Sequence, residues 1–390
     1  MRLFLSSFYM VSMCLLRFAR FATLALIVGG VVSCASAPPA TAPDKQLSAE
    51  LLSAPRILVP KRLNQVVWEE VDGWQEDSLI GATTALRENC LRVKRLSDWT
   101  RVCAAAEQLD ELDPEKARAF FERYFTPFQL ANKDGSVEGL ITGYYEPLLR
   151  GSRVRRDPYN YPLYRWPKGV PKNALLSERA QLLKSEVLKG AELVYVDDPI
   201  EAFFLQVQGS GRIVMENGQV VRVGYSGSNG KPYHSIGRWL IDRGELTPAQ
   251  ATMQGIKAWA RANPARLEEV LGVNPRFVFF KEMPARADEG AARNRADGPI
   301  GALGVRLTPG RSIAVDPSWV ALGMPIFLST RWPKGGPLKR LVFAQDVGAA
   351  VKGAVRADYF WGSGEKAGML AGTMKAPGRM WILLPNKVED

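Results

Sequence analysis

The sequence contains very little histidine and cysteine, and this scarcity excludes several kinds of active site. Among 390 residues there are one His and four Cys. Zinc sites rich in histidine, two-histidine iron sites and relays of several histidines are therefore excluded, and a catalytic triad could use only His234. The four cysteines are too few for a disulfide scaffold, and their spacing matches no zinc ribbon. Hydrolytic chemistry would have to depend on carboxylates.

A long apolar run is also missing. Residues 21–32 are uncharged and mostly apolar, but a bilayer span needs about 20 such residues. Arg17 and Arg20 precede this run and Cys34 follows it, which is the layout of a secretory signal over residues 1–33. The sequence Val31–Cys34 resembles a bacterial lipobox, in which the cysteine is lipidated and becomes the new N-terminus. An uncleaved anchor helix is the alternative.

The residue after Cys34 is Ala35 and not an aspartate, which favours an outer-membrane lipoprotein that faces the periplasm. Residues 34–44 are rich in Ala, Pro and Thr and predict a flexible tether. An apolar stretch upstream of the signal leaves Met1, Met10 and Met13 as candidate starts. We therefore expect a lipid anchor in the membrane, joined by a tether to the folded part of the chain.

The charge of the chain is basic. The formal net charge is +11, and removal of the signal lowers it by the three positive charges of Arg2, Arg17 and Arg20. In an exported protein this favours an anionic wall polymer or anionic lipid headgroups as partners. The sequence has no stripe of Lys and Arg interleaved with aromatic residues, so we expect no nucleic-acid partner.

Export also changes the interpretation of the remaining cysteines. Cys90 and Cys103 would lie in an oxidising compartment, on either side of a predicted helix start at Ser97. We predict a disulfide between them. A catalytic cysteine paired with His234 is the alternative.

Two kinds of sequence pattern follow one another along the chain. A capped helix is predicted over residues 113–125, a strand over 140–147 and a hairpin over 213–223. After residue 274 the pattern changes to short apolar strands with Gly and Pro between them, and residues 310–387 contain no long helical pattern. This pattern favours a closed barrel over an α/β sheet. The candidate strands cover residues 277–280, 313–315, 325–328, 341–344 and 380–383.

Three aspartates near the C-terminus are the main candidates for catalytic residues. Asp316 and Asp346 directly follow apolar strand runs, and Asp358 precedes the aromatic run 359–361. Glycines surround them and allow a backbone to approach a ligand closely. The alternative for each aspartate is a turn cap that bonds its own backbone. The spacing alone does not identify the catalytic one.

A second group of residues is suited to sugar recognition. Its members combine amide, hydroxyl and phenol groups, which donate to and accept from sugar hydroxyl and acetamido groups. Two neighbouring tyrosines could stack on sugar faces. Hydrated turns are the alternative, and the Gly-Ser-Gly sequence at 209–211 is too short for a phosphate loop. The residues are Tyr144, Tyr145, Gln206, Gln208, Ser210, Tyr225 and Asn229.

These motifs together resemble the membrane-bound lytic murein transglycosylase A family. The resemblance covers residues 80–384 approximately and rests on five motifs; Ala349-Ala350 stands where the family often has Gly-Ala. The last motif resembles the domain named for three aspartates. The motifs are Thr142–Pro147, Gln206–Gly211, Tyr225–Gly237, Gly301–Gly304 and Gln345–Gly353 with Asp358 beyond it.

The resemblance implies a mainly β fold with several helices. Residues 45–147 and 273–390 would form a double-psi β-barrel, and residues 148–272 would form an inserted β-rich domain, with glycan bound in a groove between the two. The family cleaves the β-1,4 bond between N-acetylmuramic acid and N-acetylglucosamine as a carbon–oxygen lyase and leaves a 1,6-anhydro end. Its catalytic acid corresponds to Asp358 and its partner to Asp346. Thr142, Asp316 and Lys352 join the expected glycan-binding residues.

Such chemistry needs one essential carboxyl group, because the C6 hydroxyl of the sugar is the nucleophile. Asp358 must start protonated, and the aromatic run 359–361 together with the charge of Asp346 would raise its pKa. No metal or cofactor is required. Complexes of cell-wall synthesis or division are candidate partners. Two alternatives remain: a hydrolase that uses Asp346 and Asp358 as an acid/base pair, and a non-catalytic wall-binding lipoprotein.

Overall fold

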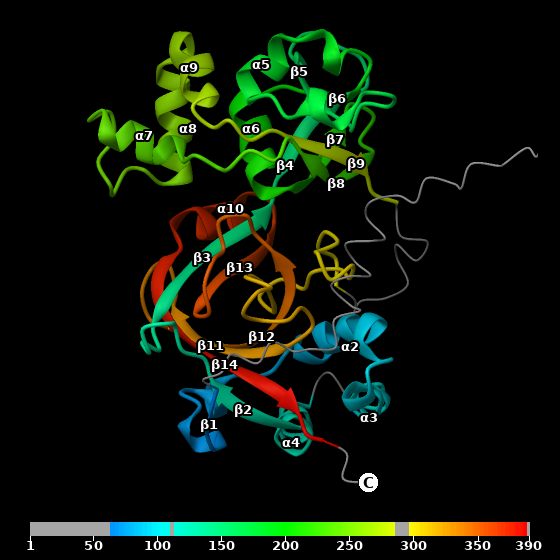
Figure 1. The fold of residues 1–390 in the computed structure, drawn as a ribbon, viewed down its shortest axis with the longest axis vertical. Coiled ribbons are helices and arrows are strands. Elements are labelled where there is room, and N and C mark those ends of the chain that lie inside the picture. Colours follow the sequence, from blue (N-terminus) through cyan, green and yellow to red (C-terminus); the bar gives the residue numbers. More distant parts are fainter. Residues whose placement is uncertain (1–62, 110–112, 285–295, 388–390) are drawn as a thin grey trace, which may run out of the picture. The chain divides into compact units, whose positions relative to one another are not determined.

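Six strands close into a barrel in the part of the chain that the structure describes. The computed structural model describes residues 63–109, 113–284 and 296–387 (Figure 1). The strand order β14-β11-β12-β10-β13-β3 returns to β14, and β1 and β2 extend the sheet beyond β14. The pairs β10–β12 and β13–β3 are parallel, and the other neighbours are antiparallel. The expected fold class, mainly β with a closed barrel and several helices, is confirmed.

The strands of this sheet are short and mostly buried. They are β1 (Asn64–Gln65), β2 (Phe125–Gln129), β3 (Gly139–Glu146), β10 (Ser312–Val315), β11 (Pro325–Arg331), β12 (Pro337–Val347), β13 (Arg356–Ser363) and β14 (Lys375–Pro385).

The two faces of the barrel wall serve different purposes. Side chains alternate along a strand, so neighbouring residues point to opposite faces. Ile313 and Val315 of β10 and Tyr359 of β13 belong to the main core. Ala314 and Phe360 belong to a separate small cluster. One face of the wall therefore stabilises the barrel, and the other is available for a site.

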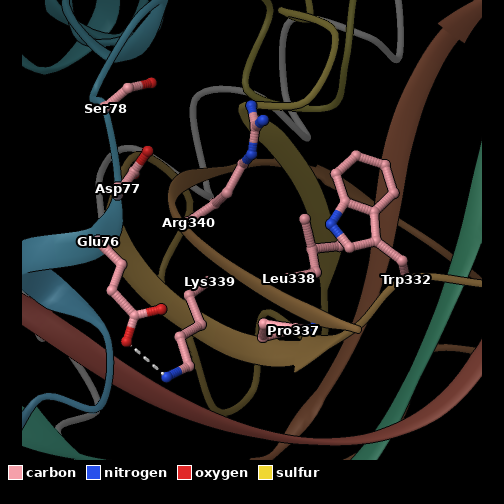
Figure 2. Close-up of a pocket in the computed structure, with 8 residues that line it drawn as sticks. All are labelled: Glu76, Asp77, Ser78, Trp332, Pro337, Leu338, Lys339 and Arg340. Carbon is pink, nitrogen blue, oxygen red and sulfur yellow. Dashed lines mark hydrogen bonds and ion pairs between the residues drawn. The ribbon is translucent and has the colours of Figure 1, made fainter. Parts of the chain in front are cut away.

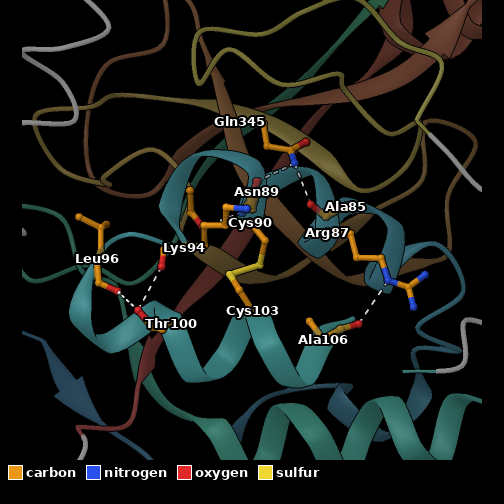
Figure 3. The surroundings of a disulfide bond; sticks show 11 residues. Ala85, Arg87, Asn89, Cys90, Lys94, Leu96, Thr100, Cys103, Ala106 and Gln345 are labelled. Atoms are coloured by element: carbon orange, nitrogen blue, oxygen red, sulfur yellow. Dashed lines mark hydrogen bonds between the residues drawn. A yellow bond between two sulfur atoms is a disulfide. The ribbon is translucent and has the colours of Figure 1, made fainter. Parts of the chain in front are cut away.

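Three helices and a disulfide cover part of the main core. These helices are α2 (Ala82–Val93), α3 (Ser97–Ala106) and α4 (Pro114–Tyr124). The Asp113 side chain caps α4 by accepting a hydrogen bond from the Lys116 backbone N–H at 3.0 Å. The predicted bond between Cys90 and Cys103 is present, with the two Cα atoms 5.5 Å apart, and it joins α2 to α3 (Figure 3). This arrangement leaves neither thiol as a catalytic partner for His234.

A second sheet of six strands lies between β3 and β10 in the sequence, in the order β5-β6-β4-β7-β8-β9. The predicted boundary at residue 272 assigns β9 to the barrel, but β9 pairs with β8 in the second sheet, so this segment continues to residue 282. The strands are β4 (Leu148–Ser152), β5 (Tyr161–Tyr164), β6 (Glu192–Val196), β7 (Ser210–Met215), β8 (Val220–Ser228) and β9 (Val278–Glu282).

Helices accompany the second sheet (Figure 1). The helices are α5 (Arg179–Lys184), α6 (Pro199–Gln208), α7 (Ile236–Asp242), α8 (Met253–Ala262) and α9 (Leu267–Gly272). Short 3-10 turns are η1 (Trp68–Glu70), η2 (Trp74–Glu76), η3 (Lys172–Leu175), η4 (Glu186–Leu188) and η5 (Pro264–Arg266). None of the helices within the described ranges is long and apolar enough to cross a membrane. The predicted signal, tether and lipidated Cys34 lie outside the described residues.

One helix contradicts the expectation that residues 310–387 contain no long helical pattern. Helix α10 (Gly364–Thr373) follows β13 directly and packs against β3 and β13. Its buried face consists of Ala367, Gly368 and Ala371, which are small residues with little apolar area. The helical periodicity is therefore weak in the sequence, although the small side chains are what allow the helix to approach β3 closely.

Candidate active site

Asp346 and Asp358 lie on either side of one alanine. Strand β10 runs between β12 and β13, and its Ala314 pairs with Asp346 on one side and with Asp358 on the other. Neighbouring strands are about 4.8 Å apart, which separates the two aspartate Cα atoms by about 10 Å. Residues that face each other across neighbouring strands point to the same side of a sheet. Both carboxyl groups therefore lie on the face that points away from the main core, with only a methyl group between them.

A β-bulge aims Asp346 at this face. Ile313 pairs with Ala344, whereas the next residue, Ala314, pairs with Asp346, so Gln345 is an extra residue in β12. Gln345 is fully buried and donates to the side chain of Asn89 at 2.7 Å. Without the bulge, Gln345 would lie opposite Ala314 and the carboxyl group would point elsewhere.

Asp346 is held by three donors. Its Oδ1 accepts hydrogen bonds from the backbone N–H groups of Ala302 at 3.0 Å and Val347 at 2.9 Å, and its Oδ2 accepts one from the Tyr144 hydroxyl at 3.1 Å. Burial raises the pKa of Asp346 to about 6; the charge of Asp358 acts in the same direction and the three donors oppose it. Burial and the two carboxylates raise the pKa of Tyr144 well above its ordinary value, so its hydroxyl remains a donor.

Asp358 has a different environment. Its Oδ1 accepts a hydrogen bond from the Thr142 hydroxyl at 2.8 Å, and Thr142 pairs with Asp358 across β3 and β13. Burial raises the pKa of Asp358, while the Thr142 hydrogen bond and the positive charge of Arg356 lower it in part. The raised pKa agrees with the expectation for a carboxyl group that starts a reaction protonated.

The expected cause of this shift is only partly correct. Phe360 lies two residues after Asp358, on the same face, and packs with Tyr144 at a ring distance of 5.2 Å. Tyr359 belongs to the main core and contacts Trp361 at 4.8 Å on the opposite face. Of the aromatic run 359–361, Phe360 alone is therefore on the face of the carboxyl group, because a strand alternates its side chains.

The Gly301–Gly304 motif supplies a backbone donor to the site. Gly301 passes so close to β12 that an added Cβ would lie 2.5 Å from the Gln345 carbonyl oxygen. This approach brings the next residue, Ala302, within hydrogen-bond distance of Asp346. A side chain at 301 would push the loop away from β12 and weaken the support of that carboxylate.

Asp316 anchors a loop, which corrects its prediction as a glycan-binding residue. It accepts hydrogen bonds from the Ser318 backbone N–H at 3.1 Å and from the Gly353 N–H at 2.9 Å. Burial tends to raise its pKa, but these donors and the Ser318 hydroxyl outweigh burial and lower the pKa of Asp316. The contact with Gly353 ties the loop between β12 and β13 to the end of β10. Lys352 in that loop is exposed.

The two predicted stacking tyrosines are buried. Tyr144 is 9% exposed and Tyr145 is 5% exposed. Tyr145 packs against Ala367 and Ala371 of α10. Neither ring offers an open face to a sugar, so the prediction of stacking is wrong, and Tyr144 acts through its hydroxyl on Asp346 instead.

Two of the predicted amides also serve the fold. The Gln206 oxygen accepts from the Arg179 guanidinium at 2.8 Å and from the Val278 N–H at 3.1 Å. Asn229 is 1% exposed and donates to the carbonyl oxygens of Ser177 at 2.8 Å and Pro275 at 2.7 Å. Both side chains are therefore occupied by hydrogen bonds within the fold.

The other predicted sugar-binding residues lie on or beside β7 and β8. The Gln208 oxygen accepts from the Tyr145 N–H at 3.1 Å, which connects α6 to β3. Ser210 begins β7 and pairs with Gly224, and Tyr225 on β8 is 47% exposed. Among the predicted aromatic contacts, Tyr225 is the one with an accessible ring.

Sequence reasoning missed a buried ion pair next to the site. Glu146 is 1% exposed and accepts hydrogen bonds from Arg212 Nε and from the Ser363 hydroxyl, both at 2.6 Å. Arg212 also pairs with Asp297 at 3.2 Å. These contacts connect β3 and β13 of the barrel with β7 of the second sheet. The end of the Thr142–Pro147 motif was the available signal, since a glutamate at the end of a buried strand needs a cationic partner.

A pocket elsewhere on the barrel is not this site (Figure 2). Asp77 in its wall pairs with Arg311 at 2.6 Å, and Glu76 pairs with Lys339 at 2.9 Å. Lys339 precedes Asp346 by seven residues on β12, which is about 23 Å along an extended strand. Within the described ranges, no group of three or more His, Cys, Asp or Glu side chains is arranged to hold a metal ion.

Comparisons with known proteins identify the relatives of this chain. The family model described as the MltA specific insert domain matches residues 140–281, and that of the 3D domain matches residues 311–384. Membrane-bound lytic murein transglycosylase A of Escherichia coli K12 is 34% identical over 261 residues, which is 65% of this chain and 67% of that protein. The structure of the lytic transglycosylase LtgG of Burkholderia pseudomallei is 64% identical, with a TM-score of 0.63 over 84% of this chain and 96% of that one. The structure of E. coli MltA with bound chitohexaose is 28% identical, with a TM-score of 0.66 over 84% and 92%.

Proposed function

Because the chain belongs to the membrane-bound lytic murein transglycosylase A family and is a lytic transglycosylase, we propose that it cleaves the β-1,4 bond between N-acetylmuramic acid and N-acetylglucosamine in peptidoglycan and leaves a 1,6-anhydro end. One observation supports this proposal above the others. Two half-buried carboxyl groups of raised pKa flank Ala314 on a single face of the barrel wall.

Asp358 is the acid and base of the proposed reaction. Its proton passes to the glycosidic oxygen as the bond between that oxygen and C1 of the muramic acid breaks. The C6 hydroxyl oxygen of the same sugar forms the new bond to C1, and its proton returns to Asp358. No water is consumed, and the intramolecular attack has a high effective molarity. The raised pKa favours the protonated form that begins this cycle.

Asp346 supports this chemistry from the other side of Ala314. The Ala302 and Val347 N–H groups and the Tyr144 hydroxyl fix its orientation. A negative charge there opposes ionisation of Asp358 and stabilises positive charge at the sugar C1 in the transition state. We assign Asp346 this electrostatic role and no proton transfer.

Glycan strands are the proposed substrate. The E. coli relative holds chitohexaose, a chain of amino sugars, in its solved structure. In this chain the exposed Tyr225 ring, Ser210 and the exposed Lys352 are the remaining candidates for sugar contacts, because Gln206 and Asn229 are used by the fold.

Membrane association follows the relatives, which are named membrane-bound. We propose that a lipid on Cys34 provides it, that the enzyme faces the periplasm from the outer membrane, and that complexes of wall synthesis or division are its partners.

Product analysis tests the function. Purified enzyme would be incubated with sacculi and the soluble fragments identified by mass spectrometry. We expect 1,6-anhydro-muropeptides from the wild-type chain and at least about 100-fold fewer from Asp358→Asn. New reducing ends would instead identify a two-carboxylate hydrolase, and binding without cleavage would identify a wall-binding protein.

A further inference from the structure

A short hydrogen-bonded chain leads from Arg356 to the catalytic carboxyl group. Arg356 Nη2 donates to the Thr142 hydroxyl oxygen at 2.9 Å, and that hydroxyl donates to Asp358 Oδ1 at 2.8 Å. Arg356 and Asp358 are two residues apart on β13, so both side chains lie on the same face. The sequence Arg-Ala-Asp in a strand therefore places a cation beside the acid.

The donor and acceptor atoms of Arg356 and Thr142 determine the direction of these two hydrogen bonds. A guanidinium group has no acceptor atom, so the Thr142 oxygen must accept from it. The hydroxyl hydrogen of Thr142 then points away from Arg356, and the acceptor that it meets is Asp358 Oδ1. Because Oδ1 accepts this hydrogen bond, the carboxyl proton is less stable on Oδ1 than on Oδ2. The protonated Asp358 therefore carries its proton on Oδ2.

Arg356 is itself held by the backbone. Its Nη1 donates to the carbonyl oxygens of Ala357 and of Leu140. Among the described residues, no carboxylate forms an ion pair with its guanidinium. Its positive charge is therefore directed through Thr142 at Asp358, without an acid that would neutralise it.

We propose that Arg356 is a positioning residue that acts through the Thr142 hydroxyl to keep Asp358 Oδ1 an acceptor and the transferable proton on Oδ2. The inference rests on the proposed function, because it assigns the proton that passes to the glycosidic oxygen to one atom. Once that proton has left, the same chain stabilises the carboxylate that remains.

Other charged and titratable groups lie on the strands and the helix next to β13 and β3, and they set the background for any change with pH. They are Asp346 on β12, Tyr144 on β3, Lys375 on β14, opposite Thr142, and Glu365 and Lys366 at the start of α10, which packs against β13.

The experiment removes each link separately. Thr142→Val removes the hydroxyl at nearly constant volume, Thr142→Ser restores it, and Arg356→Gln removes the charge. Arg379→Gln, whose arginine pairs with Asp72 on another part of the barrel, is the matched control. Two measurements are made on each variant: the pH dependence of kcat and KM for anhydro-muropeptide release, and the titration of the Asp358 carboxyl carbon by ¹³C NMR.

We expect Thr142→Val and Arg356→Gln to move the carboxyl titration and the basic limb of the kcat profile to higher pH by about one unit. For Thr142→Val, kcat should fall about 10-fold with little change in KM. Thr142→Ser and Arg379→Gln should resemble the wild type. A titration unchanged in Thr142→Val, or one that moves to lower pH in Arg356→Gln, would overturn the inference. The NMR titration needs no turnover, so failure of the wild-type enzyme to release anhydro products would count against the proposed function only.

Discussion

Asp346 and Asp358 carry the same functional group, but their hydrogen bonds differ. Asp346 accepts from two backbone N–H groups and a phenol, so both of its oxygens are occupied. Among the described residues, Asp358 accepts a single hydrogen bond, from the Thr142 hydroxyl on Oδ1, which leaves Oδ2 for a substrate. A carboxyl group that must exchange a proton with a ligand needs a free oxygen. This difference favours Asp358 as the acid independently of the family resemblance.

Replacing each aspartate by asparagine tests this assignment. Asp358→Asn removes the transferable proton and should reduce anhydro-muropeptide release by about 10²- to 10⁴-fold or more. Asp346→Asn retains an oxygen for the two backbone donors, and we expect a smaller loss. Release rates from purified sacculi would be measured side by side.

Asp134→Asn is the matched control, because this aspartate lies in an exposed turn and accepts from Ser136. It should keep nearly full activity. If Asp358→Asn kept near-normal release while Asp346→Asn did not, the assignment of the acid would be wrong.

Individual polar residues were harder to interpret than the aspartates. Asn229 precedes a glycine and Gln206 lies three residues before one, in sequence surroundings where an amide suits a sugar as well as a backbone. Their actual partners, Val278 and Pro275, lie far away in the chain. A single sequence contains no signal for such long-range hydrogen bonds, whereas an aspartate at a strand end is a local pattern.

At the scale of elements, composition predicted strands better than it predicted α10. The strands β10, β11 and β12 are recognisable in the sequence as short apolar runs, because their residues are buried on both faces. The buried face of α10 is made of alanine and glycine, which contribute little to an apolar pattern. Close packing against β3, and not the burial of large side chains, stabilises this helix.

Gly368 tests this account of α10. An added Cβ would lie 2.8 Å from the ring of Tyr145, which is buried and cannot easily move. Alanine normally stabilises a helix relative to glycine by about 1 kcal/mol. We expect Gly368→Ala to destabilise the protein instead, by about 1–3 kcal/mol, as overpacking does. The free energy of unfolding in urea would show this.

Gly272 at the end of α9 provides the matched control, because nothing lies within 4 Å of a Cβ added there. Gly272→Ala should be neutral or stabilising. If Gly368→Ala were as stable as Gly272→Ala, α10 would have room for a larger side chain against β3. Close packing would then not explain the small residues of this helix.

At the scale of the whole molecule, the closed barrel depends on pairings that local patterns do not contain. β3 pairs with both β13 and β14, from the other end of the sequence, and the bulge at Gln345 sets the register of β12 on β10. The short strands indicated a barrel, but the expectation that the N- and C-terminal parts build it together came from the family resemblance, and neither source gave the strand order. The same holds for the division of the chain, where β9 extends the second sheet beyond the expected boundary.

The proposed lipid anchor also belongs to this scale, because it would set where the enzyme works without contributing to the site. If Cys34 is lipidated, Cys34→Ser should move the protein from the membrane fraction to the soluble periplasmic fraction. Its activity on isolated sacculi should persist, since Asp346 and Asp358 lie in a barrel formed by residues far along the chain. Fractionation followed by immunoblotting measures the first effect and fragment release measures the second.

A Cys14→Ser variant is the control, because that cysteine lies within the predicted signal and should leave the distribution unchanged. Membrane attachment that persists in Cys34→Ser would favour the uncleaved anchor helix instead.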